Sequence, residues 1–249
     1  MAGILIGRLA ALPHAAAAGV VFSRQNFWRA QIIRIMPENE SFGGSEREMK
    51  RRLAEIEKQV QIENKPLGEI GVAIVQAATN CRDAAKASIQ APTEKVRIER
   101  EIYIFYEFIY FFMHMTLRQA FGVLSATQMG KLQGYLGPLI SSTAIDSYFA
   151  HWPDDIKQKM TNEFYEKLNE SEMEYSESTK LDNPFLEGEE RSAARLKKLF
   201  MKVASNIASL AVDDDENAPD VILLVIKTAL DEWDKMRLDT LVANVAKSG

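Results

Sequence analysis

Residues 92–121 have the sequence PTEKVRIEREIYIFYEFIYFFMHMTLRQAF, and this stretch decides the fold. Pro92 suits the start of a helix, because the first turn needs no hydrogen bond from its nitrogen. Successive side chains on a helix lie about 100° apart, and between Tyr103 and Arg118 apolar side chains take nearly every direction around the axis. A helix with this pattern is surrounded on most sides, so we expect it at the centre of a bundle.

A narrow polar stripe interrupts this helix. Its members fall within about 40° of one another around the axis, and they are Arg100, Glu107, His114 and Arg118. The interpretation that we favour is a face in contact with water, or a structural pairing of Glu107 and Arg118 with His114. In the alternative, the stripe is a buried acid–base or ion-pair cluster in which His114 titrates near neutrality. The surrounding aromatic side chains are predicted to form core, with a ligand pocket as the alternative.

The two interpretations of the stripe predict different effects of the substitution His114→Gln. On a solvent face, the free energy of unfolding changes by less than about 0.5 kcal/mol. In a buried linked group, the loss of one partner costs about 3–5 kcal/mol, because an uncompensated charge remains inside the protein.

Further helices are predicted on both sides of this stretch. Capping boxes, in which two side chains satisfy free backbone N–H groups, start at Ser45 and Ser125. Residues 49–60 carry one narrow apolar stripe, and residues 69–89 keep a helix-compatible pattern for about 20 residues, longer than most strands. We therefore expect an all-α fold, a multi-helix bundle of about six or seven helices between Ser45 and Ala246.

Three features of the second half lead to specific expectations. Pro138 is expected to kink or split the helix that follows Ser125. Residues 163–190 hold ten acids and two lysines, which predicts a solvated helix face followed by a loop. Apolar side chains from Ile222 to Leu241 keep a helical spacing, which predicts a final helix over that range.

The N-terminal part differs from the rest in charge. Residues 1–37 contain four arginines and no acid, whereas the remainder holds 26 bases and 35 acids. We expect a basic N-terminal arm over residues 1–44, poorly ordered or a targeting segment, and a helical domain over residues 45–249. A short strand is expected, if anywhere, at residues 31–36.

Composition excludes several classes of protein. Of the 249 residues, only 13 are Gly and 8 are Pro, too few for a turn-rich all-β chain. The acidic body argues against a nucleic-acid surface, which needs clustered Lys and Arg. Cys81 is the only cysteine, so an internal disulfide and a cysteine-based zinc cage are excluded. On its Ala-rich helix Cys81 is expected to be an inert, small apolar residue.

The sequence predicts no catalytic group, metal or cofactor. It contains no phosphate-binding Gly-rich loop and no Gly-x-Ser-x-Gly elbow. None of its three histidines stands three residues after a glutamate, as in the Glu-x-x-His pairs of di-iron bundles. Residues 213–216 are all acidic but lack the spacing and glycine of a calcium loop, so a solvated turn is expected.

The function that we favour from the sequence is a non-catalytic helical interaction or adaptor protein in the cytoplasm, with another protein or a second copy of this chain as its partner. The alternative is a small-molecule-binding protein or enzyme with a pocket near Glu107, His114 and Arg118. A third hypothesis is a peripheral membrane protein tethered by residues 1–36. A pocket beside His114 favours the second hypothesis, and an exposed apolar patch above about 600 Å² favours the first.

Overall fold

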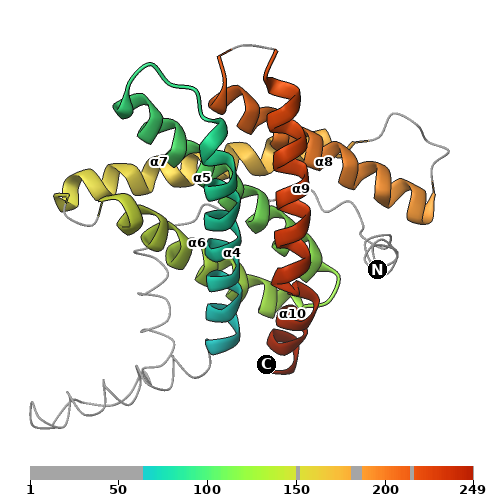
Figure 1. Ribbon diagram of the computed structural model, residues 1–249. Helices are drawn as coiled ribbons and strands as arrows, with labels where there is room; N and C mark the ends of the chain where they lie inside the picture. The colour runs from blue at the N-terminus through green and yellow to red at the C-terminus, as the bar shows by residue number, and fades with distance from the viewer. Residues whose placement is uncertain (1–63, 150–151, 181–186, 214–215, 249) are drawn as a thin grey trace, which may run out of the picture.

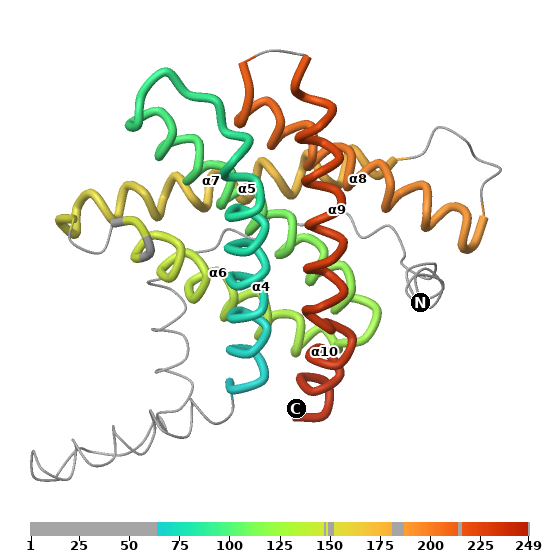
Figure 2. The backbone as a smooth tube through the Cα atoms, viewed as in Figure 1, coloured from blue at the N-terminus to red at the C-terminus, as the bar shows by residue number. Residues whose placement is uncertain are grey.

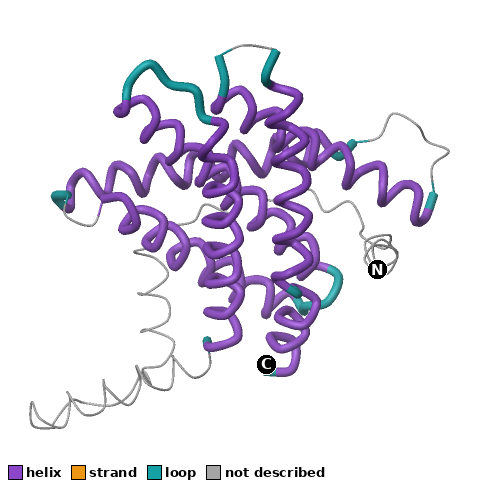
Figure 3. Tube along the Cα trace, viewed as in Figure 1, coloured by secondary structure: helices purple, strands orange, loops and turns teal. Residues whose placement is uncertain are grey.

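The computed structural model describes residues 64–149, 152–180, 187–213 and 216–248. Within these ranges the chain is helical and contains no strand (Figure 3), which confirms the predicted all-α class. None of the described helices is long and apolar enough to cross a membrane. Several predicted features lie outside the described residues: the basic arm over 1–44, the strand at 31–36, the Ser45 capping box and the helix at 49–60.

The helix α5 (Glu94–Phe121) is the centre of the bundle, as its sequence predicts. It begins after Thr93, whose side-chain Oγ1 accepts a hydrogen bond of 3.3 Å from the backbone nitrogen of Val96. Its neighbours are α4 (Lys65–Ala85), α6 (Ala126–Phe149), α7 (Asp154–Ser178), α8 (Gly188–Ala211) and α10 (Leu238–Lys247). Four side chains that its pattern predicts as core are fully buried: Phe105, Phe108, Phe111 and Phe112.

The remaining helix, α9 (Ala218–Met236), packs against both α4 and α8. In Figures 1 and 2, α4 and α9 lie side by side and run in opposite directions, with α5 crossing behind them. A short 3₁₀ turn over Lys86–Ser88 follows α4.

Cys81, on the buried side of α4, is 1% exposed, and burial raises the pKa of its thiol. Both observations support an inert apolar role for this cysteine.

The observed helices differ from the sequence predictions at three positions, which are Pro66, Pro138 and Arg237. The helix α4 begins at Lys65 and holds Pro66 in its first turn, where a proline needs no hydrogen-bond partner. The helix α6 continues through Pro138, so it is not split there, and a kink at Pro138 stays a prediction. The predicted helix over 222–241 ends at Met236, and α10 follows, because Arg237 adopts a left-handed conformation with φ of 47°. The Ser125–Gln128 capping box is confirmed by hydrogen bonds in both directions.

Candidate functional site

The polar stripe of α5 is largely covered by other helices and buried at His114, so the prediction of a solvent face is wrong. His114 is 2% exposed, and Glu107 and Arg118 are half-buried. The reason is that both α7 and α8 pack against α5, which the pattern of α5 alone does not reveal. Arg100, the fourth member, lies apart from the others: it donates to the carbonyl of Gln90 and forms an ion pair with Asp213.

Glu107 is held by two side chains from neighbouring helices. Its Oε1 atom accepts hydrogen bonds from the Tyr175 hydroxyl of α7 at 2.6 Å and from Nδ2 of Asn206 of α8 at 2.7 Å. Asn206 also donates to Glu174, which forms an ion pair with Lys202. Burial raises the pKa of Glu107, and the two hydrogen bonds that it accepts lower it in part.

His114 pairs with an acid that the sequence analysis places on a solvated face. Its Nδ1 lies 2.8 Å from Oε2 of Glu172, and its ring contacts the ring of Tyr175 edge-on with centroids 5.4 Å apart. Since a carboxylate only accepts hydrogen bonds, Nδ1 carries the hydrogen. The other ring nitrogen, Nε2, is buried without a hydrogen-bond partner in the described part of the chain, as is Oε1 of Glu172.

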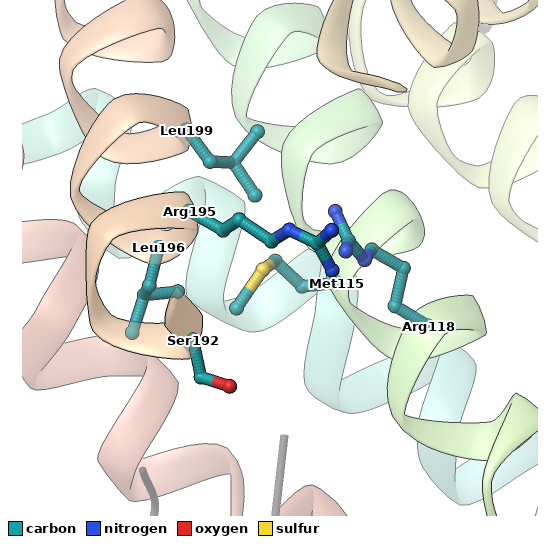
Figure 4. A pocket seen from close by; sticks show the side chains of 6 residues that line it. All are labelled: Met115, Arg118, Ser192, Arg195, Leu196 and Leu199. Atoms are coloured by element: carbon teal, nitrogen blue, oxygen red, sulfur yellow. The ribbon is translucent and has the colours of Figure 1, made fainter. Parts of the chain in front are cut away.

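Arg118 faces a second arginine. Its one hydrogen bond among the described residues joins Nη1 to Oγ1 of Thr179 over 3.3 Å. Figure 4 shows its guanidinium and that of Arg195 from α8 pointing toward one another across a small pocket. Burial is the main cause that lowers the pKa of Arg118, and the like charge of Arg195 lowers it further. The negative charge of Glu172 acts in the opposite direction and raises this pKa. Arg195 has no ion pair within the described ranges, and its Nε is buried without a partner.

The partners of the stripe come from α7 and correct the interpretation of residues 163–190. Glu172, Tyr175 and Thr179 are separated by three and four residues, so Glu172 and Tyr175 lie on one face of α7 and Thr179, which caps its C-terminal end, continues that face. This face continues the apolar spacing that ends at Phe164 and Leu168. The continued spacing is the signal in the sequence that could have identified these three residues as partners of the polar stripe. The three stripe residues bind α7 side by side and do not pair with one another.

A cavity of about 200 Å³ lies at the other end of the stripe and is lined by Glu107. Tyr103, Tyr106 and Tyr110 of α5 also line it. Four phenylalanines of this helix, Phe105, Phe108, Phe111 and Phe112, are fully buried, while these three tyrosines line the cavity.

No group of three or more potential metal ligands lies close together in the described ranges. Comparison with known proteins finds no matching family model, no similar curated protein and no similar solved structure. The function is therefore argued from the geometry of this site.

The substitution Glu107→Gln is expected to make the protein more stable than the wild type at neutral pH, by an amount that grows with pH. The native state keeps the Glu107 proton to a higher pH than the unfolded chain, since burial raises its pKa above the ordinary value of 4.5. Stability from this group is therefore complete below about pH 4.5 and declines as the pH rises through the folded-state pKa. Glutamine keeps the acceptor for Tyr175 and Asn206 but does not titrate.

Urea unfolding of both proteins between about pH 4 and pH 8 measures this difference. Glu170→Gln, on the exposed side of α7, is the matched control and should show no such trend. A stability difference that is independent of pH would contradict the raised pKa of Glu107.

Proposed function

We propose that the protein binds a small molecule through a carboxylate or phosphate group of that molecule, between Arg118 and Arg195. The observation that supports this most directly is the pair of facing guanidinium groups (Figure 4). Among the described residues neither guanidinium forms an ion pair with a carboxylate, although the charge of Glu172 acts on Arg118. The proposal develops the second of the three hypotheses from the sequence, which places a pocket near Glu107, His114 and Arg118. Arg118 lies one turn beyond His114 on α5.

The chemistry of the two side chains fits an oxyanion. A guanidinium is planar and offers parallel N–H donors, which match the two oxygens of a carboxylate or phosphate group. The Nε of Arg195, which lines the pocket, is buried without a hydrogen-bond partner in the described part of the chain. Buried donors without acceptors are costly, so an anion that accepts from them is bound favourably.

Charge also favours an anion at this position. Two cations that face each other repel, and the lowered pKa of Arg118 shows that burial and Arg195 both disfavour its charged form. An oxyanion between the two guanidiniums removes the repulsion and supplies hydrogen-bond acceptors. Its binding should therefore stabilise the folded protein.

The dimensions of the pocket restrict the bound group. The pocket is partly open to solvent and has a volume of about 20 Å³, whereas one water molecule requires about 10–15 Å³. Only a small headgroup enters a space of this size. Met115, Leu196 and Leu199 form the apolar part of the lining, so the remainder of the ligand lies against an apolar rim.

The experiment is a titration with inorganic phosphate and, separately, with acetate, followed by calorimetry and by thermal unfolding. Each anion is compared with sodium chloride at the same ionic strength, because salt alone screens charges. We expect phosphate or acetate to raise the melting temperature more than chloride does. Arg118→Gln and Arg195→Gln should each raise the Kd about tenfold to hundredfold, the effect of losing a charge-assisted hydrogen bond.

Lys197→Gln provides the matched control, because it removes one exposed positive charge from the same helix. This variant should keep the wild-type affinity. Without ligand, Arg118→Gln should melt at or above the wild-type temperature, since the substitution removes the repulsion from Arg195. The proposal is wrong if phosphate and acetate act no differently from chloride, or if Lys197→Gln weakens binding as much as Arg118→Gln.

The other two hypotheses from the sequence remain predictions. An adaptor role, a homodimer and a cytoplasmic location each await direct measurement. The membrane tether depends on residues 1–36, which lie outside the described residues.

A further inference from the structure

The cavity of about 200 Å³ lies between α5 and α7, with Leu210 of α8 on its border. It is separate from the arginine pocket, because Tyr110 precedes Arg118 by eight residues, about 12 Å along a helix axis. The volume is below the range of about 300–1,000 Å³ that is usual for drug-sized ligands. A ligand enclosed here is therefore small.

One wall of the cavity is aromatic. The rings of Tyr106 and Tyr110 both contact the ring of Phe164, with centroid distances of 5.6 Å and 5.2 Å. Tyr106 and Tyr110 also lie near each other, with centroids 6.4 Å apart. Tyr103, one turn before Tyr106, is 38% exposed and forms the outer part of the lining. Aromatic rings carry partial negative charge on their faces and attract cations placed over them.

The charged side chains around this wall are mainly acidic. Glu107 and Glu163 both line the cavity. The pKa values of Tyr103 and Tyr106 are raised, chiefly by burial, and the negative charge of Glu163 adds to this effect. The one cationic side chain in the described lining, Lys167, forms an ion pair of 2.7 Å with Glu170. The cavity thus combines electron-rich rings with two carboxyl groups and one lysine, which forms an exposed ion pair with Glu170.

We propose that this cavity binds a small organic cation, an ammonium group with apolar substituents. The tyrosine and phenylalanine rings contact the apolar substituents and attract the positive charge. The carboxyl groups of Glu107 and Glu163 balance that charge. A neutral molecule of the same shape gains only the apolar contacts, and an anion is repelled. This site does not depend on the arginine pocket, because it involves different side chains and the opposite ligand charge.

The test compares choline with its neutral isostere 3,3-dimethylbutan-1-ol, in which carbon replaces the charged nitrogen. Both are titrated into the full-length protein and followed by calorimetry. We expect choline to bind with a Kd about tenfold or more below that of the isostere, as a desolvated cation–π contact implies. Equal affinities, or no binding of choline, would overturn the proposal.

Three substitutions at the cavity distinguish its residues from general surface charge. Tyr103→Ala and Glu163→Gln should each weaken choline binding about fivefold or more, because each removes an attraction to the cation. Lys167→Met should strengthen choline binding, because it removes the cation at the cavity. None of the three should change the affinity for the neutral isostere as strongly.

Glu166→Gln is the matched control for Glu163→Gln, since it removes an exposed carboxylate from the same helix three residues away. The affinity of this variant for choline should equal that of the wild type. If Glu166→Gln weakens binding as much as Glu163→Gln, the attraction comes from overall negative charge and the site is not the cavity. Because Tyr103 is partly exposed and the other substituted side chains lie at or near the surface, all four variants should fold, which their circular dichroism spectra can verify.

Discussion

The substitution Phe111→Ala is expected to lower the free energy of unfolding by about 3–5 kcal/mol, the usual cost of removing a buried phenylalanine. Phe111 is fully buried near the middle of α5. Its ring contacts Phe112 with centroids 5.1 Å apart and Phe200 of α8 edge-on at 5.0 Å. Truncation therefore leaves a cavity between two helices and removes aromatic contacts in addition to apolar burial.

Urea unfolding monitored by circular dichroism measures this cost. Phe121→Ala is the matched control, since Phe121 ends the same helix and is 43% exposed. We expect a loss below about 1 kcal/mol for that variant, as for most partly exposed positions. If Phe111→Ala and Phe121→Ala lower the free energy of unfolding by similar amounts, the two side chains are equally buried. That result would contradict the central position of the middle of α5.

The central position of α5 is predictable because it follows from a single helix. Apolar side chains in nearly every direction require partners on nearly every side, whatever those partners are. The cap at Ser125 is predictable for the same reason, since it depends on residues within four positions. Long helices with local signals of this kind make an all-α class visible in the sequence.

The burial of the polar stripe is not predictable from α5, since it depends on which helix covers that side. The partners Glu172 and Tyr175 follow His114 by 58 and 61 residues in the chain. They lie within a run of acids that is typical of a solvated face. Only the spacing from Leu168 to Tyr175, which continues the buried face of α7, points to their role. The pairing of Arg118 with Arg195 has no such local signal, because it arises from the packing of α5 and α8.

Because His114 is buried, a substitution there is expected to destabilise the protein well beyond the surface range. His114→Leu should lower the free energy of unfolding by about 2 kcal/mol, since the Glu172 carboxylate loses its donor while it remains largely shielded from water. Complete removal of a partner from a fully buried pair costs about 3–5 kcal/mol. Glu172 keeps 27% of its side chain exposed, so solvent offsets part of that cost.

A double-mutant cycle separates the pair from the rest of the packing. The cycle combines His114→Leu with Glu172→Ala, and we expect a coupling free energy of about 1–2 kcal/mol between them. The matched control combines His114→Leu with Glu170→Ala, on the exposed side of α7, and should show no coupling above about 0.5 kcal/mol. If the first coupling is as small as the second, the contact between Nδ1 and Glu172 contributes little. The destabilisation by His114→Leu would then come from the loss of its other contacts, such as the edge-on ring contact with Tyr175, and not from the pair with Glu172.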